Sequence, residues 1–127
     1  MTRDVIRAAA LAAVMFTSAC DWGPEGPGQL SGVLRSGSIP LGAVVLEITG
    51  PGIEGFSGAG QTRVFHAEPE PGVHRVALLT SSPGRFDFSM AVEDVRAPMP
   101  AVTPLQAVDA DNGPVVDLTG IFVNISR

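Results

Sequence analysis

The 127-residue chain contains no lysine, no tyrosine and only one cysteine, Cys20. With a single cysteine, no disulfide can form within the chain. The eight basic residues are all arginine and are outnumbered by thirteen acidic residues, which gives a net charge of −5. Nucleic-acid binding needs a basic surface, so this charge disfavours it. No internal apolar run is long enough to span a bilayer.

Aromatic residues are sparse at 6%, but the hydrophobic content of 45% is that of a globular protein. The length is sufficient for one domain and short for two. Fifteen glycines and eleven prolines require many turns.

The start of the chain has the organisation of an export signal. Arg3 and Arg7 form a positively charged region, and residues 8–16 are an apolar run. This run has the length of a signal-peptide core and is too short for a transmembrane helix. It has no polar face at helical spacing, which argues against a buried helix of the folded domain. We expect residues 1–19 to be a signal peptide.

The segment Phe16-Thr-Ser-Ala-Cys20 resembles the lipobox of bacterial lipoproteins. The resemblance implies that diacylglycerol is attached to the Cys20 thiol and that cleavage makes Cys20 the acylated N-terminus. Members of the family usually have leucine where this chain has Thr17. An ordinary signal peptide cut after Ala19 is the alternative. A lone exported thiol favours modification, because it has no partner in the chain. We therefore expect a cell-envelope protein anchored to a membrane through acyl chains.

The remainder divides into a Gly/Pro-rich tether, residues 20–28, and one domain, residues 29–127. Short apolar runs in this domain are separated by turn residues at regular spacing. The expected strands are residues 30–35, 43–49, 62–67, 73–80, 85–92, 101–108, 115–118 and 121–126. Residues 50–60 are expected to be a glycine-rich loop, and residues 69–72 a turn. The pattern predicts an all-β fold, a single antiparallel β-sandwich of about seven strands, with a small closed barrel as the alternative.

Alternation within the runs predicts which side chains face the core. The expected inward residues are Val44, Leu46, Ile48, Phe86, Phe88, Met90, Val92, Ile121, Val123 and Ile125. The pattern around residues 48–53 and 116–125 loosely resembles cohesin-like or immunoglobulin-like sandwich domains of bacterial envelope lipoproteins. The resemblance implies a module that binds or spaces something, and it transfers no residue-level function.

Two sequence patterns suggest enzyme chemistry but lack the context that it needs. Residues 50–55 read G-x-G-x-x-G, but no helical pattern follows to hold a pyrophosphate. Ser57 sits in a segment similar to a nucleophile elbow, but Ala59 replaces the second glycine. We expect no catalytic residues and no cofactor.

Two clusters of metal-ligand residue types remain. His66, Glu68, Glu70 and His74 could suit zinc or copper if a hairpin brought them together, although solvated surface residues are the preferred interpretation.

Asp109, Asp111 and Asn112 place oxygen atoms at the spacing of a calcium loop, without the other positions of an EF-hand. The preferred interpretation is a hairpin turn. Asn112-Gly113 suits a type I′ turn, in which Gly113 would have a positive φ.

The sequence thus predicts a non-enzymatic binding or structural module of the cell envelope. The alternative is a calcium-stabilised, ligand-binding accessory domain. The membrane is the expected partner through the acylated Cys20, and a further protein or glycan partner is left open. Edge strands and residues 50–60 are the expected contact surfaces.

Overall fold

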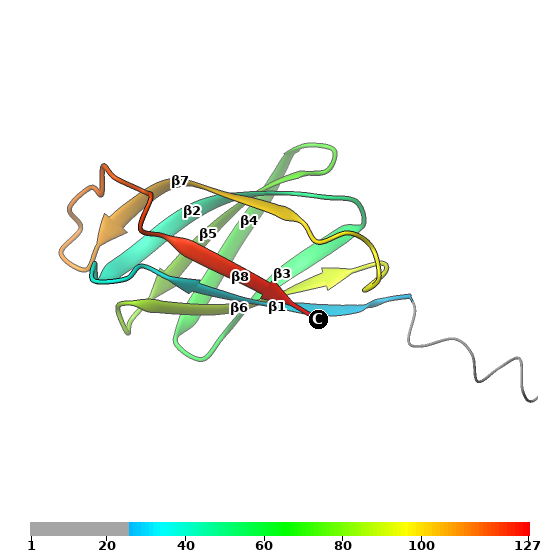
Figure 1. Ribbon diagram of the computed structural model, residues 1–127, viewed down its shortest axis with the longest axis horizontal. Coiled ribbons are helices and arrows are strands. Elements are labelled where there is room, and N and C mark those ends of the chain that lie inside the picture. The colour runs from blue at the N-terminus through cyan, green and yellow to red at the C-terminus, as the bar shows by residue number, and fades with distance from the viewer. Residues whose placement is uncertain (1–25) are drawn as a thin grey trace, which may run out of the picture.

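The computed structural model describes residues 26–127, which form two four-stranded sheets packed face to face (Figure 1). Sheet A has the strand order β3-β6-β1-β8, and sheet B has the order β4-β5-β2-β7. The strands are β1 (Gly28–Arg35), β2 (Leu41–Thr49), β3 (Ile53–Ala59), β4 (Thr62–Glu70), β5 (Val73–Thr80), β6 (Arg85–Val92), β7 (Ala101–Asp109) and β8 (Phe122–Ser126). All pairings are antiparallel. The predicted all-β sandwich is confirmed, with eight strands in place of about seven.

The core lies between the sheets and is built by period-two alternation. In β6, Phe86, Phe88 and Met90 are at most 2% exposed, while the intervening side chains face solvent. β2 contributes its own buried row to the same core. The predicted inward faces of these two strands are therefore confirmed. Within residues 26–127, no helix is long and apolar enough to cross a membrane.

The chain changes sheet at almost every connection. Among the eight strands, β4 and β5 are the only consecutive pair that are neighbours in one sheet. The edge strands are β3 and β8 in sheet A, and β4 and β7 in sheet B. β8 lies beside β1, at the opposite edge of sheet A from β3 (Figure 1). Three of the four sheet edges, all except the one formed by β4, thus bring together segments that are distant in the sequence.

The prediction that residues 50–60 form a loop is wrong, because β3 occupies Ile53–Ala59 and pairs with β6. Gly58 of this strand allows two backbones to approach closely. A Cβ placed on Gly58 would collide with the carbonyl oxygen of Thr62 in β4. Glycine in a strand often marks such an approach. Gly58 therefore serves the packing of β3 against β4.

The expected turn at residues 69–72 is shorter than predicted. β4 continues to Glu70, which pairs with Val73, and the register shifts between Ala67 and Glu70. Pro69 lies within this irregular part of β4, where an edge strand tolerates a missing N–H.

The expected strand at residues 115–118 is absent. One isolated bridge, Val108 to Pro114, forms where the chain leaves β7. The segment after it packs Val115 and Leu118 against the core without strand pairing. In the next segment the inward face is confirmed: Ile121 is buried, whereas Val123 and Ile125 are half-buried and pack on the core.

Candidate functional site

Cys20 and the whole predicted signal peptide lie outside the described residues. The tether, residues 20–28, is described only from Gly26 onward. Gly28 already belongs to β1, a central strand that pairs with both β6 and β8. An anchor at Cys20 would therefore connect to the interior of sheet A through only a few residues.

The predicted calcium residues Asp109, Asp111 and Asn112 lie together in the loop after β7. Oδ1 of Asp109 accepts hydrogen bonds from the N–H of Asp111 at 2.9 Å and from the N–H of Gly113 at 2.8 Å. The N–H of Asn112 donates to the carbonyl oxygen of Asp109 at 3.1 Å, and the N–H of Asp109 donates to that of Gly113 at 2.8 Å. The loop is thus a closed hairpin turn organised by one carboxylate.

The turn is not of type I′, because Gly113 lacks a positive φ. Asn112 has φ 63° and is the only non-glycine residue with a positive φ in the described chain. Three residues, 110–112, separate the Asp109–Gly113 pair, which is the arrangement of a three-residue hairpin whose last loop residue is left-handed. Asparagine tolerates this conformation better than most residues. The prediction of a type I′ turn was wrong because it considered only Asn112 and Gly113. It left out the Asp109 side chain, whose hydrogen bonds to the N–H groups of Asp111 and Gly113 hold the longer loop together.

Chemically, the loop offers the free Oδ2 of Asp109 and the exposed side chains of Asp111 and Asn112. One carboxylate oxygen is already saturated by two backbone donors. Among residues 26–127, no group of three or more His, Cys, Asp or Glu side chains is arranged to hold a metal ion. Calcium binding by the two aspartates and Asn112 stays the alternative interpretation of this loop, and the hairpin turn the preferred one.

The two histidines meet at the β3/β4 side of the sandwich. Phe56 of β3 lies between them, with ring-centroid distances of 5.2 Å to His66 and 5.5 Å to His74. His74 is 4% exposed, and its Nε2 lies 3.3 Å from Oε2 of Glu68. The expected proximity across the hairpin thus involves a shared aromatic ring and one carboxylate. Glu70 is exposed and takes no part in these contacts, so this cluster is mainly a packing arrangement.

Buried His74 has one nitrogen, Nδ1, without a hydrogen-bond partner in the described residues. Nε2 is the nitrogen that faces the Glu68 carboxylate. A buried polar atom without a hydrogen-bond partner costs stability.

The enzyme-like patterns do not assemble a reactive group. The hydroxyl of Ser57 projects from the outer face of β3 and shares a 2.7 Å hydrogen bond with the hydroxyl of Ser89. Both histidines pack on the opposite, inner side of β3, around Phe56. Residues 50–55 lead into an edge strand and not into a helix. These contacts give Ser57 a structural partner in place of a general base.

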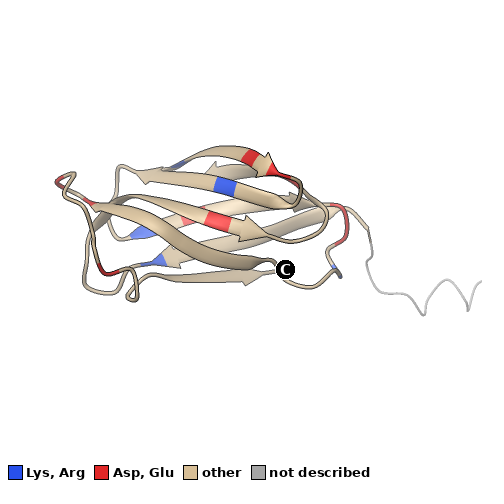
Figure 2. Ribbon diagram, turned by 90° about the horizontal axis from the view of Figure 1, so that it is seen from above, with Lys and Arg blue, Asp and Glu red and all other residues tan. Residues whose placement is uncertain are grey.

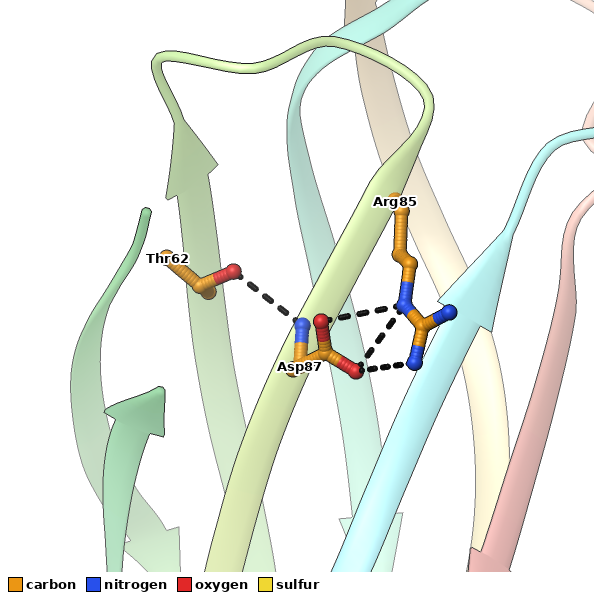
Figure 3. Close-up of polar contacts among 3 residues, drawn as sticks. All are labelled: Thr62, Arg85 and Asp87. Carbon is orange, nitrogen blue, oxygen red and sulfur yellow. Dashed lines mark hydrogen bonds and ion pairs between the residues drawn. The ribbon is translucent and has the colours of Figure 1, made fainter. Parts of the chain in front are cut away.

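The clearest ion pair lies on the outer face of β6. Nε and Nη2 of Arg85 donate to the Asp87 carboxylate at 3.0–3.1 Å, and the N–H of Asp87 donates to Oγ1 of Thr62 at 3.1 Å (Figure 3). The side-chain hydrogen bond and the charge of Asp87 raise the pKa of Arg85 above its ordinary value. An exposed pair of this kind contributes little to stability and forms no site.

Charged positions are scattered along strands and loops (Figure 2).

The structure reveals a surface that the sequence analysis missed, a shallow depression of about 280 Å³ on sheet A at the β1/β8 edge. Its lining residues are Val33, Arg35, Phe122, Val123 and Asn124. Arg35 is the register partner of Phe122, and Val33 that of Asn124. Phe122 is 67% exposed. Phe122 is apolar but lies between the inward-facing Ile121 and Val123, so the alternation directs its side chain outward. This apolar residue on the outer face was the sequence signal for the surface.

No protein-family model, curated protein or solved structure matches this chain.

Proposed function

We propose that this protein is an exported, lipid-anchored component of the cell envelope whose β-sandwich acts as a non-enzymatic binding or structural module. The observation that carries the proposal is the segment Phe16-Thr-Ser-Ala-Cys20, which places the only cysteine directly after a signal-like sequence. A lone thiol at this position is the residue that lipoprotein acylation uses.

The arrangement of the chain is consistent with an anchor at Cys20. Residues 20–28 span at most about 30 Å when fully extended, so the acyl chains would hold the sandwich close to the membrane surface. Without residues 1–19, the chain has six arginines and twelve acidic residues. Such an acidic domain is repelled by anionic headgroups, and its attachment would depend on the acyl chains.

Support for a non-enzymatic role comes from the side chains that could serve as a nucleophile or a general base. The hydroxyl of Ser57 is paired with Ser89, and His74 is buried against Phe56 and Glu68. A catalytic site needs a nucleophile or base within reach of substrate, oriented by a second group. In residues 26–127 these side chains instead stabilise strand contacts.

Membrane fractionation tests the proposal. The wild-type chain, expressed in a bacterium that processes lipoproteins, is expected in the membrane fraction and to be released by detergent but not by high salt. Cys20→Ser removes the thiol and should move the protein to the soluble envelope fraction. Thr17→Leu, which restores the usual residue of the family, is the matched control and should remain in the membrane. Retention of Cys20→Ser in the membrane would refute the anchor.

A further inference from the structure

The four edge strands of the sandwich differ in how they are protected against pairing with another chain. Exposed edges are usually protected by charge, proline or irregular register. β4 carries Pro69 and several charged residues, and its register is irregular near Glu70. β7 contains Pro104 and two register shifts, and β3 has a shift at Glu54. Three of the four edges are therefore less suited to a further strand.

β8 has none of these features. Its sequence, Phe-Val-Asn-Ile-Ser, contains no charge and no proline, and its register with β1 is regular throughout. With five residues it has the length of an average strand. Within residues 26–127, β1 is the only strand that pairs with β8, and no other backbone hydrogen bond reaches it. Its outer edge is thus a regular, uncharged template for another strand.

The depression on sheet A lies directly beside this edge. Phe122 and Asn124 alternate along β8 on the outer face, so a strand added next to β8 would place its own outward side chains against them. The exposed ring of Phe122 supplies apolar contact area, and Asn124 supplies hydrogen-bonding groups.

Charge indicates the chemistry of the added strand. Arg35, at the wall of the depression, has no acidic partner within residues 26–127, whereas Arg85 on the neighbouring strand is paired with Asp87. Arg35 would be two strand spacings, about 10 Å, from the backbone of an added strand, a distance that an arginine and a glutamate side chain can bridge together. A second copy of β8 brings no acidic residue to this position.

We propose that β8 accepts an extended acidic peptide as a ninth strand of the sandwich, with an acidic side chain directed to Arg35 and an apolar one packed on Phe122. Backbone hydrogen bonds along the edge supply affinity, and the two side-chain contacts supply specificity. This inference names the partner class of the proposed binding module, but its chemistry does not depend on the anchor.

Nuclear magnetic resonance with the soluble Cys20→Ser chain tests the inference directly. The probe is a capped peptide slightly longer than β8 that carries valine and glutamate in turn on one face and threonine at every position of the other face. Its two counterparts carry lysine for glutamate, or proline at the centre. The acidic peptide should shift the signals of Arg35 and residues 122–126, and should slow hydrogen exchange at alternate amides of β8. The lysine counterpart should bind about fivefold more weakly, and the proline counterpart should not protect the amides.

Variants separate the two side-chain contacts. Arg35→Glu should reverse the preference between the acidic and lysine peptides, and Phe122→Ser should weaken both. Arg63→Glu and Phe65→Ser are matched controls on β4, where Arg63 lies 5.9 Å from the ring of Phe65, and should leave binding unchanged. Equal binding of all peptides, or shifts confined to β3, β4 or β7, would overturn the inference. Concentration-dependent shifts of β8 without peptide would overturn it in favour of a second copy.

The result is independent of the anchor experiment. Peptide binding by the Cys20→Ser chain can succeed when the native chain proves not to be acylated. It can also fail when acylation is demonstrated. The two failures are therefore distinguishable.

Discussion

The ring of Phe88 lies across Gly32, its register partner on the neighbouring strand β1. A Cβ placed on Gly32 would come within 2.6 Å of Cε1 of that ring. Both residues are buried in the core, where sheet A faces sheet B. A phenylalanine ring of β6 therefore occupies the volume that a glycine leaves open on β1, a contact that favours this register of the two strands.

Gly32→Ala should destabilise the domain by about 1–3 kcal/mol, because the new methyl group must displace a buried ring in a packed core. Gly55→Ala is the matched control in the same sheet, since a Cβ there meets no atom within 4 Å. It should change the free energy of unfolding by less than about 0.5 kcal/mol. Urea unfolding of both variants measures the difference, and equal stability would show that the ring does not lie over Gly32.

Phe88→Ala should cost about 3–5 kcal/mol, the usual range for truncating a buried phenylalanine. Because the two sites are in contact, Gly32→Ala combined with Phe88→Ala should cost less than the sum of the single changes. A loss below about 1 kcal/mol for Phe88→Ala would contradict the register of β6.

In the loop after β7, Asp109→Ala should destabilise the domain by about 1–2 kcal/mol, because two backbone N–H groups lose their acceptor. Asp111→Ala is the control, because its exposed side chain accepts neither of these bonds. The hairpin interpretation predicts the same losses in calcium and in EDTA, measured by thermal unfolding. Losses at both aspartates that appear only with calcium would identify the loop as an ion site.

Gly113 provides a second test of the same turn. Because a Cβ at Gly113 would lie 2.9 Å from Oδ2 of Asp109, Gly113→Ala should displace the carboxylate and destabilise the turn. Asn112→Gly should be tolerated, since glycine adopts the positive φ of this position without strain. Thermal unfolding of the two variants measures both effects. The reverse order of stabilities would contradict the close approach of Gly113 to Asp109 and the left-handed conformation of Asn112.

Asp117 gives a pH-dependent prediction. The hydroxyl of Thr119 donates to Oδ1 of Asp117 at 2.6 Å and the N–H of Thr119 donates to it at 3.0 Å, which together lower the pKa of this carboxyl below its ordinary value. A lowered pKa means that the ionised form is favoured by folding. Its small stabilising effect is present above the ordinary aspartate pKa and is lost as the pH falls through the lowered one.

Thr119→Ala should therefore raise the pKa of Asp117 toward its ordinary value, as measured by titration of the carboxyl carbon by nuclear magnetic resonance. Thr103→Ala, on exposed β7, should leave this titration unchanged. An unaltered pKa in Thr119→Ala would show that the turn does not hold the carboxylate.

The sequence predicted those parts of the fold in which local alternation decides the outcome. The inward faces of β2 and β6 were recognisable because each residue's burial follows from its neighbours two positions away. β3 was not recognisable, because a glycine such as Gly58 is typical of a loop. In the structure, Gly58 allows the backbone of β3 to approach Thr62 in β4. Close approach of this kind depends on tertiary packing.

The candidate sites show the same division. The cluster Asp109–Asn112 was found because its residues are adjacent, although its turn type depended on a side-chain hydrogen bond that the residue pattern did not include. The depression beside β8 was missed, because Arg35 and Phe122 are distant in the sequence and meet only through the pairing of β1 with β8. Strand order could not be deduced from alternation alone.

The most direct test of the central proposal is the intact mass of the protein extracted from membranes with detergent. The account predicts a chain that begins at Cys20, with residues 1–19 removed and a mass increase equal to acyl groups attached to the cysteine. Alkaline hydrolysis of the ester-linked chains should reduce that mass in steps of whole fatty acids. A chain that begins at Cys20 with an unmodified thiol, or one that retains residues 1–19, would contradict the account.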